Sequence, residues 1–352
     1  MRTMQTPSDP AATTTPSEVG SGAGTAGGAG AGGGVASGAG GSGSGAKRPA
    51  HSRSGLVYAF AAYGLWGFLP LYFIALAPAG ALEVVAWRVL FSLVFCVVLI
   101  TATRTWRKLI ALLRQPRIMF TMGAAGALIY VNWLTYVFAT LTGHVVEASL
   151  GYFINPIVTV FLGVFFLRER LRPAQWVAVG VSLLAVLVLA IGYGSLPWIA
   201  LVLAFSFGFY GYIKKLVGGS VDAVSGLTIE TVWLTPVAIV QLIVVSVMGG
   251  LTFGTVSVWH TLLLVSAGVI TAVPLLFFAS AARRLPLTWM GFVQYCAPVL
   301  QFIVGVAILH EPMPPERWLG FGLVWVALAV LTVDLLLSGR RARRAEPVAR
   351  TA

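Results

Sequence analysis

The chain has 352 residues, of which 58% are hydrophobic and only 10% are charged, and its mean hydropathy is +0.90. A soluble domain usually has about 45–50% apolar and about 25% charged residues, so this composition excludes an ordinary soluble enzyme, a disordered chain and a disulfide-built secreted domain. The net charge of +12 is typical either of a nucleic-acid-binding protein or of a membrane protein with cytoplasmic basic loops, and the positions of the charges must decide.

The first segment, residues 1–54, differs in composition from the rest of the chain. Its stretch 20–45 consists almost entirely of Gly, Ala and Ser, so it has no apolar periodicity with which to build a core. It also lacks the apolar central segment of a secretory signal peptide. We expect residues 1–54 to form a disordered cytoplasmic tail that stays attached to the chain.

From Gly55 onwards, apolar segments alternate with short connections. The segments are close to the roughly 20 residues that an α-helix needs to cross a bilayer, and they lack the alternation of a transmembrane β-barrel. The sequence therefore predicts an all-α integral membrane protein. Its ten expected spans are residues 55–76, 81–102, 118–140, 145–167, 174–192, 195–214, 223–248, 258–281, 286–309 and 316–337.

The basic residues are concentrated in alternate connections. With ten spans, the basic connections all fall on the side of the N-terminal tail, and the opposite connections contain only Arg317. Because cytoplasmic loops carry an excess of Lys and Arg, both termini are expected in the cytoplasm of a cell with the chain in its inner membrane. The C-terminal segment 339–352 is expected to be a basic cytoplasmic tail, and nucleic-acid binding is not expected.

An internal repeat relates the fourth and fifth expected spans to the ninth and tenth. At an offset of 142 residues, the matched pairs are Pro156 and Pro298, Gly163 and Gly305, Glu169 and Glu311, and Trp176 and Trp318. The chain thus reads as two five-helix halves, 55–192 and 193–338. Because five is odd, the second half is inverted in the membrane, as in secondary transporters. The alternative is a duplication retained only for packing.

Several motifs resemble one family of membrane carriers. Residues 147–156 read EASLGYFINP, residues 168–171 read RERL, residues 62–67 read AYGLWG, and the third span contains Asn132 and Trp133. Over about residues 55–338 the chain resembles the RarD-type permeases of the EamA group in the drug/metabolite transporter superfamily. The resemblance implies a ten-helix inner-membrane carrier whose central cavity is lined by spans one, three, four, six, eight and nine. It implies no catalytic residue, and the tail at 1–54 departs from the family pattern.

Three ionisable residues are expected within or at the edge of the membrane, where charge is costly. Arg88 lies about 9 Å inside the second span at 1.5 Å per residue. It would bind an anionic substrate group or a carboxylate such as Glu147, or else snorkel outward or form a structural ion pair. Glu147 is alternatively a first-turn carboxylate favoured by the helix dipole. Glu230, in the seventh span, is the candidate for proton coupling, against a role as a hydrogen-bonded structural carboxylate.

Neutral polar and aromatic residues in the spans supply further candidates for substrate binding. These groups either face a common cavity or form interhelical contacts, which are worth about 0.6 kcal/mol on average in bilayers. Pro156 and Pro298 are expected to kink their spans, either in a gating helix or for packing alone. The substrate-binding candidates besides Arg88 are Trp66, Asn132, Tyr136, Tyr152, Asn155, Gln294 and Tyr295.

The sequence therefore predicts a secondary transporter, a permease or exporter, that moves a small metabolite or drug-like molecule by alternating access with a proton gradient as candidate energy source. The alternative is a channel-like or structural membrane protein without gradient coupling. No enzyme, cofactor or metal is expected, because the chain lacks a His-Glu-x-x-His pair and a phosphate-binding loop. Expected partners are the lipid bilayer and a small amphipathic or zwitterionic substrate such as an amino acid, with a homodimer as candidate assembly.

Overall fold

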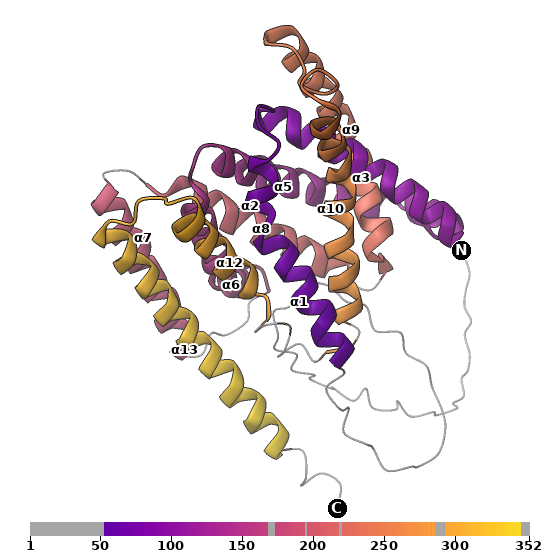
Figure 1. Ribbon diagram of the computed structural model, residues 1–352. Coiled ribbons are helices and arrows are strands. Elements are labelled where there is room, and N and C mark those ends of the chain that lie inside the picture. The colour runs from indigo at the N-terminus through magenta and orange to yellow at the C-terminus, as the bar shows by residue number, and fades with distance from the viewer. Residues whose placement is uncertain are drawn as a thin grey trace, which may run out of the picture.

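A computed structural model describes residues 53–167, 173–193, 196–217, 220–282, 284–285, 290 and 293–345. Every regular element in these ranges is a helix (Figure 1). Helix α1 (Arg53–Gly67) includes the last two residues of the expected N-terminal tail, and residues 1–52 lie outside the described ranges. Helix α13 (Pro315–Ala345) continues into the expected C-terminal tail, so residues 339–345 are helical.

Seven of the described helices are long and apolar enough to cross a membrane. Apart from α13, which extends beyond its expected span at the C-terminal end, each coincides with an expected span to within a few residues. Uninterrupted apolar sequence of this length favours helices whose backbone groups are satisfied internally. The chain is therefore a multi-pass membrane protein. Besides α13, these helices are α3 (Ala81–Thr103), α5 (Pro116–Leu141), α6 (Val145–Leu167), α7 (Pro173–Tyr193), α9 (Ala223–Met248) and α10 (Val258–Ala282).

Three expected spans correspond to shorter or broken helices. The first divides into α1 and α2 (Leu69–Ile74), and the sixth is α8 (Trp198–Val217), with an apolar part that ends at Lys214. The ninth contains α12 (Cys296–Ile303) and a π-helical turn, η2 (Val304–Ile308), while residues 286–289 and 291–292 lie outside the described part of the chain. A short helix that the sequence did not predict, α4 (Trp106–Leu113), lies in the second connection.

Prolines account for the break in the first span. Pro70 has no N–H to donate to the carbonyl of Trp66, four residues earlier, and the helix is interrupted between them. The Nε2 of Gln301 in α12 donates to that carbonyl instead, at 3.1 Å. Close approach of the two helices is possible because Gly67 has no side chain; a Cβ there would lie 2.6 Å from the Cβ of Leu300.

The two prolines that were expected to kink their spans, Pro156 and Pro298, lie in different positions of their helices. Pro156 lies inside α6, as expected, where its missing N–H removes a helical hydrogen bond to Tyr152. Pro298 is only the third residue of α12. The first-turn N–H groups of a helix have no intrahelical partner in any case, so proline is tolerated there. The ninth span is interrupted at Gln294 and Tyr295, one turn before Pro298, and the expected role of this proline in gating stays a prediction.

Helices from the two expected halves interleave. Helices α7 and α13 lie side by side at one edge of the molecule (Figure 1), and α3 packs on α9, so like-numbered spans meet. Three further pairs of contacts between the halves correspond when like-numbered spans are exchanged. Contact α5–α8 corresponds to α1–α10, α6–α8 corresponds to α1–α12, and α3–α10 corresponds to α5–α9.

The apolar core divides into clusters on either side of α6. One cluster joins α6 to α7, α8 and α13, around buried residues such as Leu189 and Phe321. Another joins α2, α3 and α5 to α6, α8 and α10, around Phe73, Tyr136 and Leu203. The second cluster borders the buried polar residues described next, so the polar site is held by helices from both expected halves.

Candidate functional site

Arg88, on α3, is buried among the helices with only 5% of its surface exposed. Its Nε donates a hydrogen bond to the Oγ1 of Thr271 on α10, at 2.9 Å. The guanidinium carbon lies 4.2 Å from the ring centroid of Trp133 on α5 and 5.5 Å from that of Phe73 on α2. Such ring contacts stabilise a cation. The side chain therefore points into the protein, and the alternative that it snorkels to the surface is wrong.

Arg88 has no counter-ion among the residues that the structure describes. Among the described residues, no carboxylate pairs with Arg88, whereas Lys214 and Glu230 do form an ion pair. Its Nη1 atom is buried and has no hydrogen-bond partner in the described part of the chain. Leaving a buried donor unsatisfied costs about 1–3 kcal/mol, and more when the group is charged. The expected alternatives of a structural ion pair and of a pair with Glu147 are therefore not what the structure contains.

Two tyrosines, Tyr136 and Tyr152, lie on the helices that pack around this cation. The Tyr136 hydroxyl is buried and, within the described ranges, makes no hydrogen bond. The Tyr152 hydroxyl donates to the Oδ1 of Asn132 at 3.0 Å. The rings of Tyr136 and Tyr152 meet edge to face, 5.6 Å apart. The Tyr136 ring also packs edge to face on Phe73, with ring centroids 6.0 Å apart, and Phe73 lies beside the guanidinium. We call the set Phe73, Arg88, Asn132, Trp133, Tyr136, Tyr152 and Thr271 the Arg88 cluster.

Asn132 ties the cluster to the second expected half. Its Nδ2 donates to the carbonyl of Leu203 at 3.2 Å and to the Oγ of Ser206 at 3.1 Å, both on α8. Its Oδ1 accepts from α6, so one amide side chain joins three helices. Together with Thr271 on α10, these bonds place the cluster between the halves. Four sequence candidates, Arg88, Asn132, Tyr136 and Tyr152, thus come together.

The remaining substrate-binding candidates lie at other places. Asn155 is one turn beyond Tyr152, and its buried Oδ1 has no hydrogen-bond partner among the described residues. Trp66 packs edge to face on Tyr63, with ring centroids 5.3 Å apart. Gln294 and Tyr295 precede α12, and Tyr295 packs against the apolar cluster of α6, α7 and α13. Their role in substrate binding stays a prediction.

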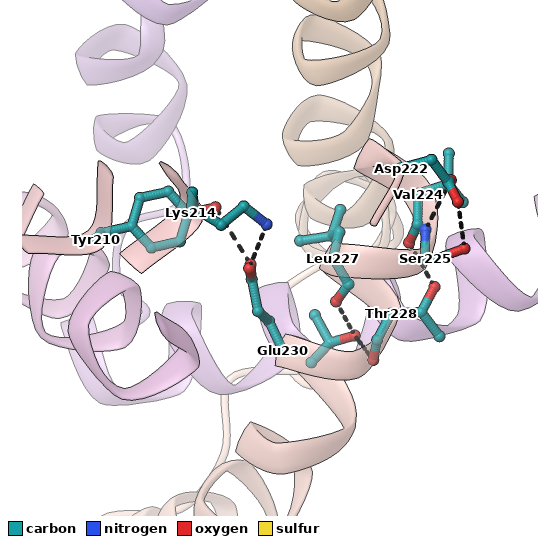
Figure 2. Close-up of polar contacts among 9 residues, drawn as sticks. Tyr210, Lys214, Asp222, Val224, Ser225, Leu227, Thr228 and Glu230 are labelled. Atoms are coloured by element: carbon teal, nitrogen blue, oxygen red, sulfur yellow. Dashed lines mark hydrogen bonds and ion pairs between the residues drawn. The ribbon is translucent and has the colours of Figure 1, made fainter. Parts of the chain in front are cut away.

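Glu230, on α9, is buried with 1% exposure, but it is not a lone acid. The ammonium group of Lys214, near the end of α8, lies 2.7 Å from its Oε1, and the Tyr210 hydroxyl donates to its Oε2 at 3.3 Å (Figure 2). Gly226 leaves room for this pair, since a Cβ there would lie 2.9 Å from the Lys214 nitrogen. The sequence analysis missed the pair because Lys214 reads as a basic loop residue.

Two further carboxylates cap helices to which they do not belong. The Glu311 carboxylate, in the connection before α13, accepts from the backbone N–H groups of Val145 at 2.6 Å and Val146 at 2.9 Å. Glu147, in the first turn of α6, accepts from the N–H of Ile199 at the start of α8, at 3.1 Å. Helix N-termini favour negative charge, so both contacts are stabilising. We call the Glu311 contact with Val145 and Val146 the α6 clamp.

The clamp carboxyl lies in a connection, and its surroundings affect its charge. Burial raises the pKa of Glu311 above its ordinary value. The two N–H donors and His144 act in the opposite direction, while Glu147 adds to the increase. A cavity of about 300 Å³ lies beside these groups. It is lined by Phe138, His144, Val146, Glu147, Leu150, Leu189, Leu196, Pro197, Trp198, Ile199, Arg317 and Phe321.

The sequence analysis also missed two buried polar residues. Glu83 is 1% exposed and accepts from the backbone N–H groups of Thr252 and Phe253, at 2.9 and 3.1 Å, so it holds the connection between α9 and α10. Its position at the start of a span was the available signal. Thr271 supplies the bond to Arg88, but a threonine in an apolar helix carries no pattern that distinguishes it from a packing residue.

Comparisons with known proteins point to one group. The EamA-like transporter family matches residues 53–191. Protein RarD of Streptomyces exfoliatus is 50% identical over 84% of this chain and 94% of its own length. Protein RarD of Escherichia coli is 42% identical over 82% of this chain and 97% of its own length. A solved crystal structure, with 19% identity and a TM-score of 0.51, covers 81% of this chain and 98% of that chain, which supports a shared fold.

Proposed function

The chain belongs to the EamA-like transporter family, in its RarD-type branch, and we propose that it is a secondary transporter that moves a small metabolite or drug-like molecule by alternating access across the inner membrane. The observation that carries this proposal is the Arg88 cluster. Buried polar and charged groups in membrane helices are costly and commonly mark substrate pathways. Here they are gathered from α3, α5, α6, α8 and α10, which belong to both expected halves.

Two inverted halves, joined at their midplane, supply the conformational change in this proposal. In secondary transporters built from inverted repeats, the site lies where the repeats meet, and access alternates as one repeat moves against the other. The repeat at an offset of 142 residues and the exchange of helix contacts between halves support this arrangement here. The basic connections support an orientation with both termini in the cytoplasm.

The α6 clamp is proposed as the closed gate on the side opposite to the basic connections. It joins the connection before α13 to the start of α6, and so ties the second half to the first. Glu147 continues the tie from α6 to α8. With these contacts formed, Arg88 is 5% exposed and Tyr136 is 3% exposed, so the substrate site is closed from water. Opening requires the clamp to break, and Pro156 offers α6 a point at which to bend.

Glu230 is proposed as the proton-coupling residue. Its carboxylate is paired with Lys214 and bonded by Tyr210, so protonation would remove one charge of the pair and loosen α8 from α9. A pair of this kind can hold one conformation until a proton arrives. Replacement by glutamine keeps the shape of the side chain and removes its titration.

Counterflow in proteoliposomes tests the proposed function. Proteoliposomes that contain the purified protein are loaded with one unlabelled compound from a panel of amino acids and short monocarboxylates. Uptake of the same compound in labelled form is then followed. A carrier gives saturable uptake that is accelerated by the unlabelled compound inside, whereas protein-free liposomes do not. Linear uptake without counterflow across the panel would contradict the proposal and favour a channel.

Proton coupling has its own test in the same vesicles. The variant Glu230→Gln is expected to retain counterflow, which needs no gradient, and to lose accumulation driven by a pH gradient. The matched control is Arg107→Gln, which neutralises an exposed residue of α4. Accumulation by Glu230→Gln at the level of the control would show that this carboxyl is not the coupling group.

A further inference from the structure

The Arg88 cluster gathers a buried positive charge, aromatic rings and hydroxyl groups. Its cation is 5% exposed and has no counter-ion among the described residues. Most buried charges in proteins are paired, and truly unsatisfied buried donors are rare enough to need an explanation. Arg88 Nη1 and the Tyr136 hydroxyl are both unsatisfied within the described part of the chain. Two unsatisfied groups beside one unpaired positive charge indicate a place for an anion.

The geometry around the guanidinium limits how an anion can approach. Trp133 covers the cation at 4.2 Å from its ring centroid, and Phe73 lies at 5.5 Å, so aromatic rings occupy the space around the guanidinium face. The Nε is committed to Thr271. Nη1 keeps its donor capacity, and N–H groups of arginine point along the plane of the fork, where they match the oxygens of a carboxylate or phosphate.

Charge balance distinguishes between these two anions. Arg88 supplies one positive charge to the cluster, and the partly buried Lys214 is already neutralised by Glu230 on other helices. A carboxylate brings one negative charge, whereas a phosphate group carries about −1.5 to −2 at neutral pH and would leave an excess in a buried site. The aromatic rings of Tyr136 and Tyr152, which meet at 5.6 Å, fit an apolar body attached to that carboxylate.

The site is also held rigidly between the two expected halves. A Cβ at Gly268 of α10 would collide with the carbonyl of Phe91 on α3, so these helices cross at close contact, one turn from Arg88 and Thr271. This contact keeps the guanidinium oriented by the Thr271 hydroxyl. A rotamer that is fixed in advance lowers the entropy cost of binding.

From these observations we propose that the transported molecule carries a carboxylate, which binds the Nη1 of Arg88 and the hydroxyl of Tyr136. This inference rests on the proposed transporter function and names the class of its substrate. The ligand enters after the α6 clamp opens and replaces the missing counter-ion. The substrate class is thus a monoanionic carboxylate with an apolar body, and its neutral amide is excluded because it leaves the cation unpaired.

Thermal unfolding of the purified full chain tests the proposal with two probes of the same shape. Benzoate carries the carboxylate, and benzamide is its neutral counterpart. A ligand that binds the folded state raises the melting temperature by mass action. We expect benzoate to raise it and benzamide to leave it unchanged. An equal response to both probes, or no response to benzoate, would overturn the proposal.

Variants of the cluster locate the response. Arg88→Gln is expected to raise the apparent dissociation constant for benzoate about 100-fold, because a hydrogen bond to a charged group and its charge are lost together. Arg88→Lys keeps the charge without the fork and should lose less. Arg107→Gln removes an exposed arginine and should keep the wild-type response. A benzoate response that survives Arg88→Gln would contradict the assignment.

A second variant keeps the test decisive if Arg88→Gln does not fold. Tyr136→Phe removes the other unsatisfied group without changing shape, and about a tenfold weaker benzoate response is expected from one lost hydrogen bond. An unchanged response would argue against the site.

Counterflow separates this inference from the proposed function. Equal counterflow of carboxylates and amides by the wild-type chain would leave a transporter whose substrate class is wrong. Carboxylate-specific binding without counterflow would support the binding site and contradict the proposed transport function.

Discussion

Two buried regions of this protein each place an ionisable residue inside membrane-spanning helices, but they treat the charge differently. Glu230 on α9 has its counter-ion, Lys214, at 2.7 Å and a second bond from Tyr210. Arg88 on α3 has aromatic rings and one hydroxyl partner, and no carboxylate pairs with it in the described part of the chain. The first region is complete within one half of the chain, whereas the second combines groups from both halves.

This difference distinguishes a charge that the fold itself neutralises from a charge that awaits an external partner. A buried pair that satisfies itself stabilises one packing of its helices, and removal of either partner leaves the other uncompensated. A buried charge without a partner stabilises no packing by itself. We infer that the partner of such a charge is a ligand that binds reversibly. Substitutions in the Glu230 and Arg88 regions test whether the two charges have these different roles.

The largest expected effect is the loss of the built-in pair. Glu230→Ala leaves Lys214 uncompensated and should lower the free energy of unfolding by about 3 kcal/mol, as when one partner of a buried ion pair is removed. Arg88→Met should cost less, because it removes an unpaired charge. Both values come from unfolding of the purified variants in mixed micelles. A larger loss for Arg88→Met than for Glu230→Ala would reverse the comparison.

The α6 clamp ranks second. Glu311→Ala removes both acceptors of the N-terminal N–H groups of α6, and a helix cap of this kind is worth about 1–2 kcal/mol. The same change should open the gate, so a cysteine introduced near Val145 should react faster with an impermeant maleimide. Glu316→Ala, in the first turn of α13, serves as the matched control. Equal reactivity of the cysteine in the two variants would show that Glu311 does not hold the gate closed.

The clamp also predicts a pH dependence. Burial raises the pKa of Glu311 in the folded chain, so the folded state holds its proton more tightly than the unfolded state. The stability that this proton supplies is present below the unfolded pKa and is lost as the pH rises through the raised folded pKa. Wild type should therefore lose stability relative to Glu311→Gln over that interval. The melting-temperature difference, measured against pH, checks the sign, and a constant difference would contradict it.

A smaller effect is expected where α12 meets the broken first span. Gln301→Leu removes the donor for the Trp66 carbonyl, which Pro70 leaves without its helical partner. A single neutral hydrogen bond contributes about 1 kcal/mol. The loss is read from unfolding of the variant. Because this contact lies away from both charged regions, the benzoate response should remain, and loss of that response would mean that the two regions are coupled.

The smallest effect is expected inside the Arg88 cluster itself. Tyr152→Phe removes the hydroxyl that donates to Asn132, and interhelical hydrogen bonds in bilayers average about 0.6 kcal/mol. Asn132 keeps its two bonds to α8, so the helices stay joined. Unfolding measurements on the variant should show a change of this size. A loss as large as that of Glu230→Ala would mean that the cluster serves mainly to hold the fold.

The sequence predicts the long helices well, because length and hydropathy determine them almost alone. Helix α9, for example, has the bounds 223–248 expected from its apolar run. Local chemistry limits the prediction elsewhere. Pro70 breaks the first span, and the ninth span is interrupted one turn before Pro298. Such outcomes depend on where a neighbouring helix can supply the missing donor, as Gln301 does, and no local pattern contains that information.

The candidate site is predictable in part for a similar reason. Arg88 stands out in the sequence because a charged residue inside an apolar span is seldom placed there for packing alone. In the structure, Asn132, Tyr136 and Tyr152 lie near it. The pairing of charges is not predictable. Lys214 lies at the end of its helix and reads as an interfacial residue, yet its long side chain reaches Glu230. Thr271 and the Glu311 clamp likewise depend on contacts between residues far apart in sequence.

One measurement tests the central claim most directly, that Arg88 is a buried cation whose partner is the ligand. Thr271→Asp places a carboxylate beside the guanidinium, and Thr271→Asn places a neutral group of the same shape there. Thermal unfolding of both variants is recorded with and without benzoate. We predict that the aspartate variant unfolds at the higher temperature and does not respond to benzoate. An aspartate variant that unfolds at the lower temperature and still responds to benzoate would contradict the account.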